Sequence, residues 1–507
     1  MKILQTGLPF IVLSLGLAVA CQAGKGGGDT RPPAVAGKFY PEQAATLRLA
    51  IEQFMRDALP AMAKEPLAIV VPHAGYIFSG QICADGYNQV RNRDYDVIVI
   101  LGTNHTAPGL RRVALYGGEG FRTPLGTAPV DRGLVAALAA AGPGFAIDAT
   151  PHAREHSVEV QVPFIQVLFP KAKILPAIVG QTDAASCGRF GTTLAKVLAG
   201  RRALIVASSD LSHYPAAGDA ELADRKTLGA IPSLDPAVLQ TALRAQAARR
   251  IPGLDTGACG EAPIMVAMAA AKALGAGGGR IVSYAHSGDL PIGEREKVVG
   301  YGAVVLGSGL EQEKAVAAPA PKGDQPLSGQ DRRALLALAR ETIARVLSTQ
   351  MVPLARGFSP AAMAPRGVFV TLKKQGNLRG CIGRMIPDRP LAVLVGTMAL
   401  QSAFEDPRFN PVTAEEVPKL EIEISVLTPM KPVASPEEIV VGRDGVLLRK
   451  GSRSAVFLPQ VAPEQGWGRD EMLDQLCMKA GLPSGAWRQG ARFETFQAVV
   501  FSEAEYR

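Results

Sequence analysis

The chain has 507 residues, of which 47% are hydrophobic and 20% charged, with a formal net charge of +8. This length exceeds one ordinary hydrophobic core and predicts two or three domains, and the composition is typical of a soluble globular protein rather than a disordered one. The cations are spread along the chain without a Lys/Arg block interleaved with aromatic residues, so nucleic-acid binding is not expected.

The N-terminus has the pattern of a secretory signal over residues 1–21. Lys2 precedes an apolar run over residues 7–20, which ends in small residues just before Cys21. The run is short for a membrane span, so we expect export to the periplasm. Two alternatives stay open: plain cleavage, or a lipid on Cys21 that would be the chain's contact with a membrane. The Gly/Lys-rich residues 22–30 are typical of a flexible tether.

The first globular block covers residues 31–307 and alternates strand-like apolar runs with helical segments such as residues 131–141. This alternation predicts an α/β domain built around a central sheet. Buried strands are expected at residues 67–72, 96–102, 173–180 and 202–210.

A composition shift over residues 308–328, rich in Ala, Pro, Lys and Glu, indicates a linker. The second block, residues 329–507, is expected to open with a helix over residues 332–347. Its strands and helices are more segregated, which favours a smaller α+β domain. Strands are expected at residues 367–372, 420–427, 445–448 and 455–458.

All six histidines lie in the first block, and several of them follow predicted strands. His73 follows the strand at residues 67–72, His105 the next strand, and Asp210 and His213 the strand at residues 202–210. Ligands of α/β sheets bind at the carboxyl ends of strands, so these loops are expected to converge. A single histidine is more often an ordinary residue, but imidazoles beside a thiolate or carboxylate are typical ligands of iron, copper or zinc. The Gly-rich loop at residues 256–263 offers both, as Cys259 and Glu261.

Six motifs occur in order across the first block: RPPAVAGKFYP (31–41), PHAGYIFSG (72–80), GTNH (102–105), REHSVEVQVPF (154–164), SSDLSHY (208–214) and TGACGE (256–261). Together they resemble the Memo family, which is protein B of the AmmeMemoRadiSam system. The resemblance implies a fold like that of the class III extradiol dioxygenases. It also implies metal binding by His73, His105 and Cys259, with His213 as acid/base and Asp210 beside it. The implied metal is non-haem iron or copper, with zinc less favoured.

The reaction does not follow from the resemblance, because Cys259 stands where the dioxygenases have a glutamate and a thiolate is a softer, more oxidisable ligand. Glu261 is an alternative carboxylate ligand. Glu155, His156 and Glu159 either line the pocket or cap and orient a helix. Three functions stay open: a metal-dependent oxidoreductase, a non-catalytic iron- or copper-handling protein, and a two-domain adaptor.

The second block resembles the AMMECR1 family, protein A of the same system, through GNLRGCIGRM (376–385) and ALQSAFEDPRFNPVTAEEV (399–417). It contains no histidine, so a catalytic metal site is not expected there. Cys381, in the first of these motifs, is either a buried, inert thiol or part of a groove for a small molecule or peptide. The family's third component, a radical SAM protein, would be a separate partner chain. The candidate groove residues are Arg379, Cys381, Glu405, Asp406 and Arg408.

Overall fold

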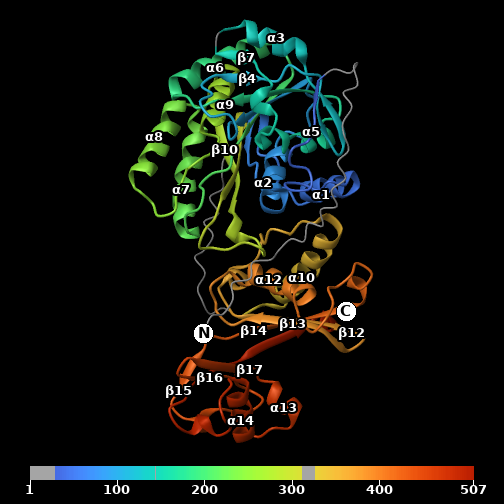
Figure 1. Cartoon of the computed structure of the whole chain (residues 1–507), viewed down its shortest axis with the longest axis vertical. Coiled ribbons are helices and arrows are strands. Elements are labelled where there is room, and N and C mark those ends of the chain that lie inside the picture. Colours follow the sequence, from blue (N-terminus) through green and yellow to red (C-terminus); the bar gives the residue numbers. More distant parts are fainter. Residues whose placement is uncertain (1–28, 143, 311–325, 507) are drawn as a thin grey trace.

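The computed structural model describes residues 29–142, 144–310 and 326–506. The predicted signal segment, most of the tether and residues 311–325 of the linker lie outside the described residues. Figure 1 shows an N-terminal α/β domain stacked end to end on a C-terminal region that carries two further sheets. Within the described ranges, no helix is long and apolar enough to cross a membrane.

The N-terminal domain is built on an eight-stranded sheet in the order β10-β11-β2-β9-β3-β8-β4-β7. The four predicted strands form its centre, where β2 pairs with β9, β9 with β3 and β3 with β8, all in parallel. Such strands are covered on both faces, which explains their continuous apolar runs. The strands span β2 Ala63–Val71, β3 Val97–Thr103, β4 Val113–Leu115, β7 Phe145–Ile147, β8 Lys173–Val179, β9 Ala203–Ser208, β10 Gly278–His286 and β11 Gly300–Leu310.

Helices cover both faces of this sheet, with α1, α2 and α5 on one side and α6, α8 and α9 on the other (Figure 1). A small sheet of β1 (Thr30–Arg31), β5 (Gly120–Thr123) and β6 (Gly126–Pro129) lies beside it. The helices span α1 Ala44–Arg56, α2 Tyr76–Asn88, α3 Arg132–Ala140, α4 His156–Glu159, α5 Val162–Leu168, α6 Ala184–Leu198, α7 Ala217–Ala230, α8 Pro236–Ala248 and α9 Glu261–Ala273.

The C-terminal region holds two antiparallel sheets, each with its own hydrophobic core. The first sheet has the order β13-β12-β14-β19 and packs against α10 and α12. The second has the order β15-β18-β16-β17 and packs against α14. The predicted α+β segregation is therefore present, but in two cores rather than one. The elements span α10 Gly329–Thr349, α11 Pro360–Met363, β12 Val368–Lys374, β13 Asn377–Arg384, α12 Leu391–Phe404, β14 Leu420–Leu427, β15 Lys431–Val433, β16 Gly445–Lys450, β17 Arg453–Phe457, α13 Val461–Gln465, α14 Arg469–Lys479, β18 Arg492–Phe496 and β19 Ala498–Ser502.

Candidate metal centre

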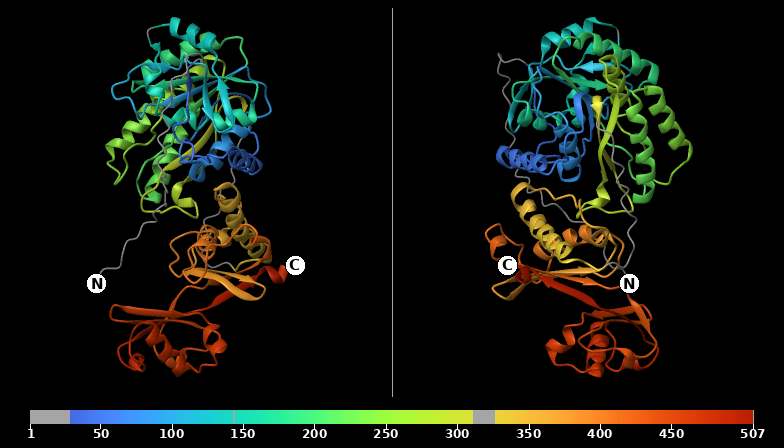
Figure 2. Two further views of the ribbon diagram at one scale, coloured as in Figure 1. Left: turned by 45° about the vertical axis from the view of Figure 1, so that its right-hand side comes forward. Right: turned by 180° about the vertical axis from the view of Figure 1, so that it is seen from behind.

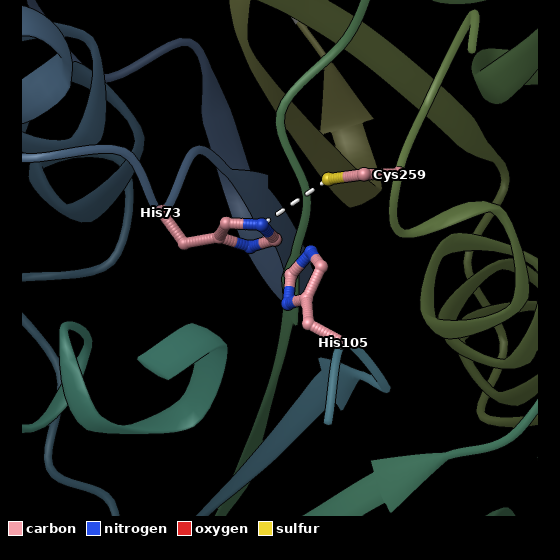
Figure 3. A group of neighbouring side chains, drawn as sticks. All are labelled: His73, His105 and Cys259. Atoms are coloured by element: carbon pink, nitrogen blue, oxygen red, sulfur yellow. Dashed lines mark hydrogen bonds between the residues drawn. The ribbon is translucent and has the colours of Figure 1, made fainter. Parts of the chain in front are cut away.

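The carboxyl ends of three adjacent parallel strands bring the predicted donors together. His73 follows β2, His105 follows β3 and Asp210 follows β9, and these strands are neighbours in the sheet. Cys259 enters from the loop before α9 and faces the two imidazoles (Figure 3). One donor atom of each of His73, His105 and Cys259 lies within 4.8 Å of the others.

The hydrogen-bond network defines the tautomer of His73. The Ser208 hydroxyl donates its proton to the Ser157 carbonyl at 2.6 Å, so toward His73 Nδ1, at 3.1 Å, it accepts. Nδ1 therefore carries the proton, and the lone pair is on Nε2. That nitrogen lies 3.1 Å from the Cys259 sulfur. Burial lowers the pKa of His73 well below its ordinary value, so the ring stays neutral.

Glu155 sets the tautomer of His105. Its carboxylate accepts from His105 Nδ1 at 2.8 Å, from the His105 backbone N–H at 2.7 Å and from the Ser157 N–H at 2.9 Å. Burial alone would raise the pKa of Glu155, but the hydrogen bonds and charge of His105 outweigh it and lower the pKa to about 2. A carboxylate on Nδ1 leaves Nε2 as the free lone pair, which is the usual arrangement behind a metal-bound histidine.

The donor set fits a transition-metal ion. Two imidazoles and one thiol converge, with the Cys259 sulfur at hydrogen-bond distance from His73 Nε2, and both rings are oriented by buried partners. Burial raises the pKa of the Cys259 thiol above its ordinary range, so the thiol is neutral until an ion displaces its proton.

His213 and Asp210 stand beside these donors, and together with Cys259 they form a second potential ligand group. The buried His213 Nε2 has no hydrogen-bond partner among the described residues, and burial lowers the pKa of this ring. Asp210 accepts from the backbone N–H groups of His73 and Ala74 at 2.8 and 3.2 Å. A neutral histidine beside a carboxylate can accept a proton from a bound molecule.

A cavity of about 630 Å³ adjoins the centre and is lined by His105 and Cys259. Glu261, at the start of α9, lines it too, and burial raises the pKa of this carboxyl group. Gln240 and Arg244 of α8 complete its polar wall. Sequence reasoning missed these two residues because they lie on an exposed helix that carries no motif.

The other predicted pocket residues differ in what they contact. The His156 ring stacks on His105 at 4.6 Å between centroids, and these two with Glu155 form a third donor group. Glu159 instead binds the N-terminal segment. It pairs with Arg31 at 2.6 Å and accepts from the Tyr40 hydroxyl at 2.6 Å.

The candidate groove of the C-terminal region brings four of its five residues together. Asp406 accepts from the Cys381 backbone N–H at 2.9 Å and pairs with Arg408 at 2.7 Å. The guanidinium groups of Arg379 and Arg408 both lie over the Phe409 ring. Arg379 is paired with Glu416 at 2.9 Å, a partner that sequence reasoning missed.

Glu405, the fifth residue, is exposed at the end of α12. Cys381 is half-buried and accepts a hydrogen bond from the Thr371 hydroxyl at 3.3 Å. Four of the five residues therefore take part in a network of backbone and arginine contacts at the end of α12.

Comparison with known proteins agrees with both resemblances. The sequence profile described as Memo-like protein matches residues 31–305, and the AMMECR1 profile matches residues 336–501. A MEMO1 family protein of Methanosarcina mazei is 35% identical over 283 residues, which cover 55% of this chain and 99% of that protein. A protein of Methanothermobacter thermautotrophicus is 42% identical over 186 residues, covering 35% of this chain and 97% of that protein.

Among solved structures, an uncharacterized protein of Pyrococcus horikoshii is 37% identical and covers 35% of this chain and 93% of its own, with a TM-score of 0.33. The profile match spans more than half of the chain, and the M. mazei protein is covered almost completely. The chain therefore belongs to the Memo-like family through its N-terminal domain, and it carries an AMMECR1 domain behind it.

Proposed function

We propose that the N-terminal domain binds one transition-metal ion through His73 Nε2, His105 Nε2 and the Cys259 thiolate, and uses it in a redox reaction on a small molecule. We take the ion to be iron or copper rather than zinc, because the proposed redox reaction needs an ion that changes its oxidation state and zinc does not. The bound ion would supply electron transfer and activation of oxygen.

The observation that carries the proposal is the orientation of both imidazoles. Ser208 and Glu155 accept the Nδ1 protons, so the lone pair of each ring is on Nε2, and His73 Nε2 lies 3.1 Å from the Cys259 sulfur. The proposed ligand set is the one expected from a likeness to the extradiol dioxygenases, with the Cys259 thiolate in place of one carboxylate.

His213 is the acid/base in this scheme. Its neutral ring, whose Nε2 has no partner among the described residues, would accept a proton from a substrate bound beside Cys259, and Asp210 would stabilise the imidazolium that forms. The polar residues Gln240, Arg244 and Glu261 would bind the substrate's polar groups.

Metal analysis of the purified, untagged chain tests the binding step. Stoichiometric iron, copper or zinc that is lost in a His73→Ala/His105→Ala double variant supports the proposal, and metal that survives this variant contradicts it. Two single variants separate the overlapping donor groups. Cys259→Ser should lose the ion and His156→Ala should retain it, and the reverse result would move the site to His105, Glu155 and His156.

Oxygen uptake by the Fe(II)-loaded chain with a panel of catechols tests the reaction. Turnover that falls in His213→Ala, with metal content unchanged, supports an enzyme.

A metal-handling function is the second candidate. It is favoured by the third donor group, which shares His105 and offers an ion a neighbouring position. Full metal loading with a His213→Ala variant that behaves as wild type in every turnover assay would favour this function.

We also propose that the chain is exported and that it works with a radical SAM protein of the same system. Cell fractionation and palmitate labelling test the location and the lipid on Cys21. Co-purification from a strain that expresses both chains tests the partner.

A further inference from the structure

The C-terminal region packs directly on α2, the helix that begins three residues after His73. Ile77 and Phe78, in the first turn of α2, contact an apolar cluster whose members Val352 and Leu400 come from the C-terminal region. Figure 2 shows α10 and the segment after it lying against the end of the N-terminal domain that carries α1 and α2. Ile77 and Phe78 are therefore partly covered by a cluster to which the second domain contributes.

An ion pair joins the same two parts further along α2. Asp85 is fully buried and pairs with Arg356, which follows α10, at 3.0 Å. The carboxylate also accepts from the Leu59 backbone N–H at 3.0 Å. A buried carboxylate is strongly destabilising when its cation is removed, so α2 depends on the second domain for its charge balance.

Hydrogen bonds connect α2 to His73. The Ser79 hydroxyl donates to the carbonyl of Ala74, the residue after His73, at 3.0 Å. From the last turn of the helix, the Tyr87 hydroxyl donates to the Gln161 side-chain carbonyl at 3.3 Å.

Gln161 continues the connection on its other side. Its amide nitrogen donates to the Pro72 carbonyl and to the Ser208 hydroxyl oxygen, both at 2.9 Å. Ser208 is the group that accepts from His73 Nδ1. The Gln161 amide therefore binds both the Pro72 carbonyl and Ser208, the partner of the His73 ring, and Tyr87 of α2 donates to the same amide.

We infer that the C-terminal region serves as a built-in clamp on α2 and that Arg356 is a positioning residue for His73. The clamp itself is independent of any ion, whereas its consequence for metal affinity rests on the proposed function. Without the pair to Arg356, α2 would shift or fray to hydrate Asp85, and the loop that presents His73 would lose its support.

Hydrogen–deuterium exchange of the full chain tests the clamp, with Arg356→Met as the variant because methionine keeps much of the apolar stem. We expect amides of residues 72–88 to exchange about tenfold faster, and the affinity for Zn²⁺, used as a probe, to fall about tenfold. Arg443→Met is the matched control, because it breaks an Arg–Asp pair at Asp444 in the second C-terminal core and should change neither quantity.

A rescue variant separates positioning from general damage. Asp85→Asn removes the buried charge and can still accept from Leu59, so in the Arg356→Met background it should restore both the exchange of α2 and the Zn²⁺ affinity. If Arg356→Met does not fold, Arg356→Lys keeps a cation without the planar fork and should show a smaller change of the same sign.

Exchange in residues 72–88 that stays within about twofold of wild type in the folded variant would overturn the clamp. Faster exchange with unchanged Zn²⁺ affinity would overturn the positioning of His73. If wild type itself does not bind Zn²⁺, iron or copper, the proposed function fails, and the exchange data alone still decide the clamp.

Discussion

Replacing Glu155 by glutamine tests the orientation of His105 with almost no change in shape. In wild type, Oε1 accepts from His105 Nδ1 and the Ser157 N–H, and Oε2 accepts from the His105 N–H. A glutamine amide has one acceptor oxygen and one NH₂ donor. If its oxygen takes the Oε1 position, the NH₂ group faces the His105 backbone N–H. If the amide flips, the NH₂ group faces Nδ1, and the ring must move its proton to Nε2.

Either outcome should weaken metal binding, and the contacts that are lost set the range of this loss. An unsatisfied buried backbone N–H costs about 1–3 kcal/mol, and a lost partner behind a metal-bound histidine reduces affinity by about 10-fold to 100-fold. The flipped amide gives the upper value, because a protonated Nε2 cannot bind an ion. We therefore expect Glu155→Gln to weaken metal binding by about 1.4–2.7 kcal/mol.

The contribution of Glu155 to the stability of the fold depends on pH with a definite sign. The pKa of Glu155 is about 2 in the folded chain against an ordinary 4.5. The folded pKa is the lower one, so the carboxylate stabilises the fold above pH 4.5, and this contribution is lost as the pH falls toward 2. Above pH 5 the difference in the free energy of unfolding between wild type and Glu155→Gln should be constant.

Competition with a chromophoric chelator measures the affinity, and thermal unfolding of the metal-free chains measures the stability change separately. A Glu155→Gln chain that binds metal within about twofold of wild type would refute the reasoning, because His105 would then bind the ion without an oriented ring, or not bind it at all.

Three further predictions concern other buried groups. Metal binding must displace the Cys259 proton, so the wild-type Kd should fall about tenfold per pH unit between about pH 7 and 8.5, whereas Cys259→Asp should show a flat profile; a flat wild-type profile would remove Cys259 from the site. Burial raises the pKa of Asp224 from 3.8 to about 6, so stability from its neutral form is present below pH 3.8 and is lost as the pH rises through 6. Relative to Asp224→Asn, wild type should therefore lose about 3 kcal/mol over that range in denaturant titrations, and parallel profiles would contradict this. Glu159→Gln leaves Arg31 buried without its anion and should lower the free energy of unfolding by about 3 kcal/mol, whereas a loss below about 0.5 kcal/mol would show that the pair is dispensable.

The sequence by itself determined the local elements and the order of the motifs. Continuous apolar runs predicted β2, β3, β8 and β9, because strands buried on both faces need apolar side chains at every position. The rule that ligand-binding loops follow such strands then grouped His73, His105 and Asp210. These predictions rest on burial and periodicity, which are properties of short segments.

The tertiary structure alone decided which groups pair over long distances in the chain. Glu155 and Glu159 lie in one motif, yet Glu159 binds Arg31 and Tyr40 whereas Glu155 orients His105. The sequence likewise did not predict the two cores of the C-terminal region or the pairing of Asp85 with Arg356. A hydrogen bond or ion pair depends on where two segments meet, and no local pattern of side chains encodes that meeting point.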